Sequence, residues 1–176
     1  FYNETNDKGI KPTPTIGGLG LIRDYQKMTT MNFKKIGNLV YVIGKTEGHL
    51  DQSIFAKDLL NERKGAPPII NLFNEKNIGE TILKLIELEL IVSCHDISLG
   101  GILTAVSKMC IKGKKGLKIN PLKGLINKYE FFFGEDQGRY IVEINKTNMK
   151  KVSEILNNNS VHHDELGILD EKMLSF

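Results

Sequence analysis

Asn38-Leu-Val-Tyr-Val-Ile-Gly44 carries the β-branched and aromatic side chains typical of a buried strand, and its glycine closes that strand. The residues that follow, 44–53, form a loop in which Asp51 is placed to cap a helix over residues 52–60. A buried strand, a loop of small or acidic residues and a further element thus follow one another. The same succession returns twice later in the chain, so three loops share one design.

Apolar spacing predicts the elements downstream of this unit. Helical spacing of apolar residues indicates amphipathic helices, and short runs rich in apolar and aromatic residues indicate strands. Helices are expected over residues 75–90, from residue 102 onward and over residues 149–156, and strands over residues 91–94, 129–133, 139–144 and 166–169.

The order of these elements indicates the fold class. The glycine-bearing loop 134–138 has a length that suits a hairpin between strands 129–133 and 139–144. Helices and strands mix without strict β-α-β alternation, which favours an α+β layered domain with a mixed sheet.

The first 24 residues differ in character from the rest. They are rich in turn-forming residues, and Lys11-Pro-Thr-Pro-Thr15 is expected to be an extended connector because proline fixes its own φ. Residues 19–22 are expected to form a short strand. The chain opens with Phe1 in a dense polar motif, so we expect it to be part of something longer, and a new unit is expected from Lys35.

Length and composition exclude several classes of protein. The 176 residues, 40% hydrophobic and 26% charged, suit one globular domain or one domain with part of a neighbour. A net charge of +3 is too mild for a nucleic-acid-binding protein, and no stretch approaches the roughly 20 apolar residues that cross a bilayer. Cys94 and Cys110 lack metal or redox spacing, so we expect reduced, buried thiols in a cytoplasmic protein.

The loop over residues 44–53 is the first candidate site. Glycines such as Gly48, placed before a helix, allow backbone N–H groups to point at a phosphate. The loop lacks the spacing of a P-loop, and Asp51 would repel a bound phosphate. A capped helix without a ligand is the alternative.

His95-Asp-Ile-Ser-Leu-Gly-Gly101 is the second candidate site. Two successive glycines at a helix start cost about 1 kcal/mol each relative to alanine if they lie inside the helix, which suggests close approach of a ligand or of packed backbone. His95 and Asp96 could orient each other or bind a metal–phosphate group. The alternative is that Asp96 or Ser98 caps the helix while His95 packs at the strand end.

Gly134-Glu-Asp-Gln-Gly-Arg139 is the third candidate site. Glu135 and Asp136 could bind Mg²⁺, which prefers oxygen ligands, and Arg139 could bind phosphate with two parallel hydrogen bonds. Arg139 could equally pair with Glu135 or Asp136 and have no other role.

Together the motifs resemble one family over almost the whole chain. In order they are Tyr2-Asn-Glu-Thr-Asn6, Ile10-Lys-Pro-Thr-Pro-Thr-Ile-Gly-Gly-Leu-Gly-Leu-Ile22, Gly44-Lys-Thr-Glu-Gly-His-Leu50, Gly65-Ala-Pro-Pro68, His95-Asp-Ile-Ser-Leu-Gly-Gly101 and Phe133-Gly-Glu-Asp-Gln-Gly-Arg-Tyr140. This set resembles the second half of the synthetase subunit in the phosphoribosylformylglycinamidine synthase family. The resemblance implies a three-layer α/β/α domain with a mixed sheet, similar to the C-terminal domain of aminoimidazole ribonucleotide synthetase. It also implies that residues 1–24 are the tail of an ATP-handling domain with its linker, and that residues 35–176 are the C-terminal domain.

The reaction that the resemblance implies requires ATP and Mg²⁺. The amide oxygen of formylglycinamide ribonucleotide is activated by phosphorylation and then displaced by ammonia from glutamine, so catalysis depends on positioning and charge neutralisation. The implied partners are the rest of the synthetase subunit, a glutaminase subunit and a small accessory subunit, with no nucleic acid and no membrane. Because the family's catalytic histidines and a Gly-Asn-x-Ser stretch lie outside this chain, we expect the chain to be inactive alone.

The resemblance assigns roles to residues of the candidate loops, but no catalytic residue and no metal ligand. Residues implied to bind nucleotide or phosphate are Gly48, His95, Asp96, Ser98, Gly100, Gly101 and Arg139, and those implied to bind substrate are Glu135, Asp136 and Gln137. The family usually has glycine where Asp51 stands and an acidic residue where Leu99 stands, which suits a half retained for assembly.

Two other functions compete with this interpretation. One is a non-catalytic module that binds a nucleotide or phosphate by itself. The other is a sibling kinase-like enzyme of the same superfamily, such as thiamine-monophosphate kinase or selenophosphate synthetase, which would not account for the motifs at residues 2–5 and 12–14.

Overall fold

A five-stranded sheet forms the centre of the protein in the computed structural model, which describes residues 2–10, 15–22, 24–62, 64–121 and 126–171. The strand order is β4-β6-β3-β7-β5. The strands are β3 (Leu39–Ile43), β4 (Ser93–Asp96), β5 (Gly116–Ile119), β6 (Tyr140–Ile144) and β7 (His163–Asp170). All four pairings between these strands are antiparallel, and the α+β class is confirmed. The expected mixed sheet is limited, among the described residues, to one isolated parallel bridge between Thr30 and Ser93 of β4.

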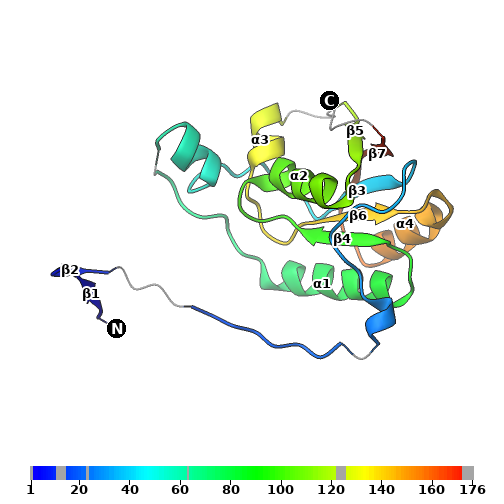
Figure 1. Ribbon diagram of the computed structural model, residues 1–176, viewed down its shortest axis with the longest axis horizontal. Coiled ribbons are helices and arrows are strands. Elements are labelled where there is room, and N and C mark those ends of the chain that lie inside the picture. Colours follow the sequence, from blue (N-terminus) through cyan, green and yellow to red (C-terminus); the bar gives the residue numbers. More distant parts are fainter. Residues whose placement is uncertain (1, 11–14, 23, 63, 122–125, 172–176) are drawn as a thin grey trace.

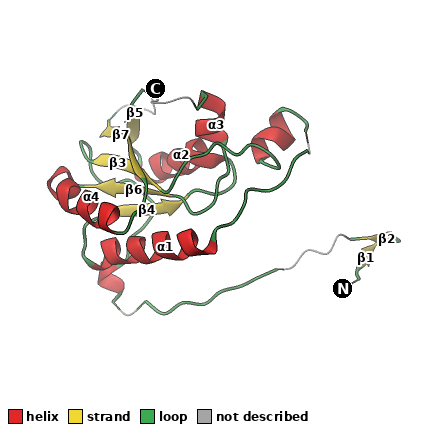
Figure 2. Ribbon diagram, turned by 180° about the vertical axis from the view of Figure 1, so that it is seen from behind, coloured by secondary structure: helices red, strands yellow, loops and turns green. Residues whose placement is uncertain are grey.

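Helices cover both faces of the sheet, as Figures 1 and 2 show. They are α1 (Leu72–Glu87), α2 (Gly101–Gly113), α3 (Lys128–Phe133) and α4 (Met149–Asn158). Because successive side chains of a strand point to opposite faces, Val40 and Val42 of β3 pack in the core beneath α2, while Tyr41 and Ile43 pack in the core beneath α1 and α4. The chain therefore forms three layers, α/β/α.

The segment 129–133 is a helix, so the expected strand and its hairpin are wrong. Asn127 starts the helix through a capping box, in which its Oδ1 accepts the N–H of Glu130 at 3.0 Å and Glu130 Oε2 accepts the N–H of Asn127 at 3.3 Å. This local cap outweighs the strand preference of the aromatic run. The loop 134–139 thus joins α3 to β6.

Residues 51–60 also differ from the expected capped helix. Gln52 has a positive φ of 60°, which interrupts the backbone directly after Asp51, and Ser53 Oγ accepts the N–H of Ala56 in place of an Asp51 cap. The helix that follows is a short π-helix, η2 (Phe55–Leu59). The next helix, α1, begins earlier than expected because Asn71 Oδ1 accepts the N–H of Asn74.

The N-terminal part lies apart from the sheet, and Figure 1 shows it as an extended arm. It contains the strands β1 (Glu4–Thr5) and β2 (Lys8–Gly9), which pair with each other. The 3₁₀ turn η1 (Tyr25–Lys27) follows the arm and lies beside the C-terminal end of α1, where Lys27 Nζ donates to the carbonyl of Glu87 at 3.4 Å. Residues 19–22 form no strand and are exposed, because no neighbouring strand pairs with them. The connector expected at residues 11–15 lies mostly outside the described residues.

The remaining elements follow the apolar pattern closely. The strands expected at 38–44, 139–144 and 166–169 and the helices expected from 102 and at 149–156 are confirmed, and a second 3₁₀ turn, η3 (Lys146–Asn148), precedes α4. Among the described residues, no helix combines the length and the apolar character needed to cross a membrane.

Candidate functional site

Three loops meet at one end of the sheet because three neighbouring strands end or begin there. Ile43, the last residue of β3, pairs with Tyr140, the first residue of β6, and Tyr140 pairs in turn with Asp96 at the end of β4. The loops 44–53, 134–139 and 97–100 therefore lie side by side. The structure brings together the three segments that the sequence marked as candidate sites.

Asp136 holds the loop that follows β3. Its Oδ2 accepts the backbone N–H groups of Glu47 at 3.2 Å and Gly48 at 3.1 Å, and its Oδ1 accepts that of His49 at 2.9 Å. Gly48 has a φ of +83°, and a side chain there would collide with Glu130. The carboxylate of Asp136 thus binds three consecutive N–H groups of its own chain.

Glu135 joins the other two loops. Its Oε1 accepts the N–H of Ile54, at the start of η2, and the N–H of Gly100, which precedes α2, both at 2.8 Å. The N-cap residue of α2 is Gly100, so neither Asp96 nor Ser98 has the capping role considered above. Glu135 satisfies a backbone donor at the N-terminal end of α2 instead.

Arg139 lies beneath these carboxylates and is only 1% exposed. Its Nη1 is 3.3 Å from Asp136 Oδ2 and donates to Thr46 Oγ1, and its Nη2 donates to the carbonyl of Gly134 at 2.7 Å. Burial lowers the pKa of Arg139, and the negative charges of Asp136 and Glu135 oppose that shift. The guanidinium therefore binds groups inside the protein, which matches the alternative that Arg139 pairs with a neighbouring carboxylate.

The two glycines before α2 allow close packing of backbone. Gly100 has a φ of +81° and Gly101 a φ of +67°, and a Cβ on Gly101 would lie 2.7 Å from the carbonyl oxygen of Phe132 and 2.8 Å from that of Gly134. Of the two explanations offered for the paired glycines, the geometry therefore matches close approach of packed backbone and not of a ligand.

His95 and Asp96 interact with each other, with 3.0 Å between His95 Nδ1 and Asp96 Oδ1. His95 Nε2 is buried and has no hydrogen-bond partner among the described residues. Ser98 Oγ accepts the N–H of Leu99 at 2.6 Å. Burial first, and then charge on Cys94, Glu75 and Asp96, raise the pKa of the neighbouring Tyr140.

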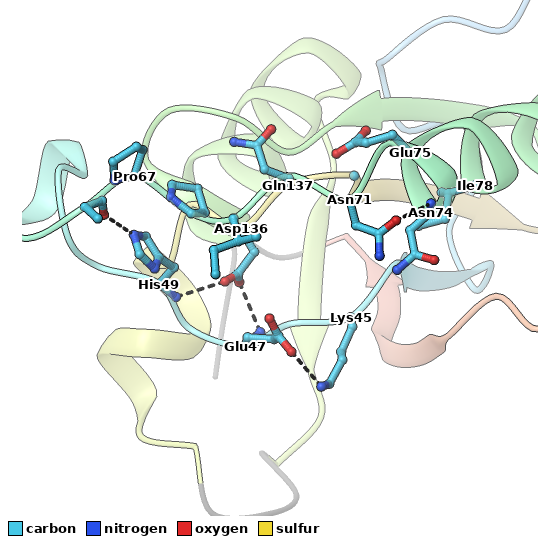
Figure 3. Close-up of a pocket in the computed structure, with 14 residues that line it drawn as sticks. Lys45, Glu47, His49, Pro67, Asn71, Asn74, Glu75, Ile78, Asp136 and Gln137 are labelled. Carbon is cyan, nitrogen blue, oxygen red and sulfur yellow. Dashed lines mark hydrogen bonds and ion pairs between the residues drawn. The ribbon is translucent and has the colours of Figure 1, made fainter.

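A pocket of about 430 Å³ opens beside the Asp136 carboxylate. Its walls come from the loop after β3, from residues 66–69, from the cap and first turns of α1, and from residues 136–138. His49 ties two of these walls together, with 2.8 Å between its Nε2 and the carbonyl of Ala66. Figure 3 shows Gln137 and Glu75 on one side of the pocket and the Lys45–Glu47 ion pair on the other.

The pocket combines amide groups with apolar surface. Asn71, Asn74 and Gln137 supply side-chain amides, Glu47, Glu75 and Asp136 supply carboxylates, and prolines with Ile69 and Ile78 supply apolar walls. This lining is more polar than that of most small-molecule sites. Of the residues that the resemblance singled out, Asp136 and Gln137 line the pocket, whereas His95, Asp96, Ser98, Gly100, Gly101 and Arg139 do not. Asn71, Asn74 and Glu75 were not recognised in the sequence. The Asn71 cap ahead of a helical pattern was the signal available for them.

Residues 35–172 match the family described as AIR synthase related protein, C-terminal domain. Among curated proteins, phosphoribosylformylglycinamidine synthase subunit PurL of Pelagibacter ubique (strain HTCC1062) is 64% identical over 171 residues, which cover 97% of this chain and 23% of that protein. The subunit of the same name in Bartonella henselae is 39% identical over 175 residues, which cover 99% of this chain and 24% of that protein. This chain therefore spans about a quarter of the length of these relatives.

Solved structures show the same fold. The structure of Thermotoga maritima PurL complexed with FGAR aligns with a TM-score of 0.68 at 21% identity, over 83% of this chain and 26% of that one. A structure of PurLQS from the same organism gives 0.68 at 19% identity, over 86% of this chain and 25% of that one. HypE of E. coli, a hydrogenase maturation protein, gives 0.58 at 14% identity, over 84% of this chain and 49% of that one.

Proposed function

The chain belongs to the family of AIR synthase related proteins, C-terminal domain, and from this premise we propose that it is the C-terminal part of a phosphoribosylformylglycinamidine synthase subunit. The observation that carries the proposal is the 64% identity to a subunit of that name over 97% of the chain. In that role residues 1–24 belong to the tail of an ATP-handling domain with its linker, and residues 35–176 form the C-terminal domain.

The whole enzyme would convert formylglycinamide ribonucleotide, glutamine and ATP to formylglycinamidine ribonucleotide, ADP, phosphate and glutamate. This chain would act in the cytoplasm beside the rest of the synthetase subunit, a glutaminase subunit and a small accessory subunit. The likeness to the PurLQS structure from Thermotoga maritima supports a multi-subunit assembly.

The contribution of this chain would be a pocket wall and the loops that shape it. Gln137 offers its amide to a ligand in the pocket, whereas Glu135, Asp136 and Arg139 hold the loops in place through internal contacts. The nucleotide- or phosphate-binding roles that the resemblance implies for His95, Asp96 and Ser98 remain predictions.

The Mg²⁺ that the whole enzyme would use needs several oxygen ligands arranged together. The described residues contain no group of three or more ligating side chains that could hold a metal ion.

An assay of ADP release tests the proposal. The complete subunit that contains this chain, with its glutaminase and accessory subunits, is expected to release ADP when given the ribonucleotide, ATP, Mg²⁺ and glutamine. The 176-residue chain alone, given ammonia in place of glutamine, is expected to release none above a blank. Robust turnover by the chain alone, or no ribonucleotide-dependent release by the complete assembly, would contradict it.

A ligand-binding module without its own chemistry is the second candidate, and the pocket of about 430 Å³ favours it. Calorimetry of the chain with ADP and Mg²⁺ tests this function. If millimolar ADP and Mg²⁺ give no heat of binding, the chain is not an independent ligand-binding module.

A further inference from the structure

Three consecutive backbone N–H groups converge on the carboxylate of Asp136, from Glu47, Gly48 and His49. Successive N–H groups that point at one anion form the kind of concavity that proteins use to bind phosphate. Here the anion is a side chain of the same chain. The loop 44–53, which the sequence indicated as a candidate phosphate site, therefore already binds the negatively charged carboxylate of Asp136.

The N-terminal end of α2 shows the same arrangement. The N–H of Gly100 points at Glu135 Oε1, and this oxygen also accepts the N–H of Ile54, with both distances at 2.8 Å. The end of a helix where phosphate commonly binds is thus occupied by a carboxylate. The adjacent residues Glu135 and Asp136 therefore fill two anion positions on two loops.

Arg139 compensates one of these two negative charges. Its buried guanidinium lies 3.3 Å from Asp136 and compensates the carboxylate from the interior side. A phosphate at either position would have to displace a carboxylate that is already hydrogen-bonded, and it would face the negative charge of the neighbouring one.

We infer that Glu135 and Asp136 are resident anions that occupy the phosphate positions of the Gly48 and Gly100 loops and exclude phosphate from both. They are specificity-determining residues, because they direct any phosphate of a ligand to other groups. Within the pocket, the remaining donors are then side chains such as Gln137 and Lys45. The inference does not depend on the proposed function, since it concerns only these loops and inorganic phosphate.

Removal of one carboxylate tests the inference. Asp136 is 8% exposed and lines the pocket, so Asp136→Ala is expected to open its three N–H partners to the pocket. The parent chain is expected to unfold at the same temperature in phosphate as in sodium chloride of equal ionic strength, apart from a small general effect of phosphate. The Asp136→Ala chain is expected to unfold at a lower temperature, and phosphate should raise that temperature by several degrees in a saturable way.

Glu143→Ala is the matched control. Its carboxylate also accepts two consecutive backbone N–H groups, those of Lys34 and Lys35, but it is 0% exposed, so phosphate cannot reach the vacated position. This variant should be destabilised without a phosphate-specific recovery. Equal phosphate responses in the parent, Asp136→Ala and Glu143→Ala chains would overturn the inference, because phosphate then acts only as a general stabiliser.

A second measurement decides the question if Asp136→Ala does not fold. Amide resonances of Gly48 and Gly100 in the parent chain are followed during titration with inorganic phosphate. Both are expected to stay in place. A saturable shift of either resonance would show that phosphate enters the loop and would overturn the inference.

Discussion

Asn38 Nδ2 donates a hydrogen bond of 2.7 Å to Glu143 Oε1, although 105 residues separate the two in the chain. The same carboxylate, fully buried on β6, accepts Ser93 Oγ of β4 at 2.8 Å and the backbone N–H groups of Lys34 and Lys35 at 2.8 and 2.9 Å. Glu143 thus fastens the segment before β3 to the sheet. No cation lies among these partners, so hydrogen bonds alone compensate its burial.

Glu143→Ala is expected to lower the free energy of unfolding by about 3–5 kcal/mol, because it leaves four donors without their buried acceptor. Glu143→Gln keeps an acceptor oxygen but turns an NH₂ group toward donors, so a smaller loss of about 1–3 kcal/mol is expected. Urea denaturation followed by circular dichroism measures both. Glu80→Ala is the control, because it removes one partner of an exposed ion pair with Lys76. It should change the free energy of unfolding by no more than about 0.5 kcal/mol.

Arg139→Met is expected to lower the free energy of unfolding about as much as Glu143→Ala, because it removes a buried cation where Glu143→Ala removes a buried anion. It leaves Asp136 buried without its cation, which costs about 3–5 kcal/mol. Arg139→Lys keeps the charge but loses the planar fork that reaches Thr46 and Gly134, so an intermediate loss is expected. Lys45→Met, at an exposed ion pair, is the control and should cost less than about 1 kcal/mol. Similar losses for Arg139→Met and Lys45→Met would contradict the importance of the buried pair.

Elements with a strong apolar period were predictable from the sequence. β3 and β6 are rich in β-branched and aromatic residues, with Glu143 as the buried exception in β6, and α2 and α4 keep one apolar stripe. Local pattern and tertiary packing therefore agree in these elements. The helix at residues 128–133 was missed because its three phenylalanines favour a strand, although Asn127 and Glu130 already carried a helix-start signal. The short edge strand β5 carried no such signal, since only its pairing with β7 defines it.

The location of the site was predictable, but its internal contacts were not. Loops at strand ends were expected to be functional, and the strand register brings them together. Whether Asp136 accepts hydrogen bonds from a ligand or from residues 47–49 depends on a neighbouring loop almost 90 residues away, which no local pattern encodes. The α1 wall of the pocket was missed because α1 begins at Leu72, before the residues where the apolar period becomes clear.

Gly101→Ala and Gly79→Ala should shift stability in opposite directions. Gly101 has a φ of +67° and a position for Cβ only 2.7 Å from a backbone carbonyl oxygen, so alanine is expected to cost about 2–5 kcal/mol. Gly79 lies inside α1 with open space around its Cβ position, so alanine there should gain about 0.5–1 kcal/mol. Calorimetric unfolding of the two variants measures the difference. A neutral Gly101→Ala would show that the backbone approach at α2 is looser than described.

Stability is expected to fall above pH 9 because of the Cys94 thiol. Burial, with a smaller effect of the Asp96 charge, raises the pKa of Cys94 from 9.0 to about 12. Above pH 9 the unfolded chain loses this proton while the folded chain keeps it, so the unfolded state is favoured progressively up to about pH 12. The stability from this group is therefore complete below pH 9 and is lost as the pH rises through that window.

Cys94→Ala separates the contribution of Cys94 from those of other groups that titrate at high pH. Urea midpoints of the parent and the variant are compared between pH 8 and 10.5, where the parent should lose more stability by up to about 1.4 kcal/mol per pH unit, the limit for one proton. The variant begins from a lower stability at pH 8, because alanine fills less of the core, so the slope with pH and not the absolute value carries the comparison. Parallel slopes would mean that the Cys94 thiol ionises equally easily in the folded and unfolded chains, and that the end of β4 is open to water.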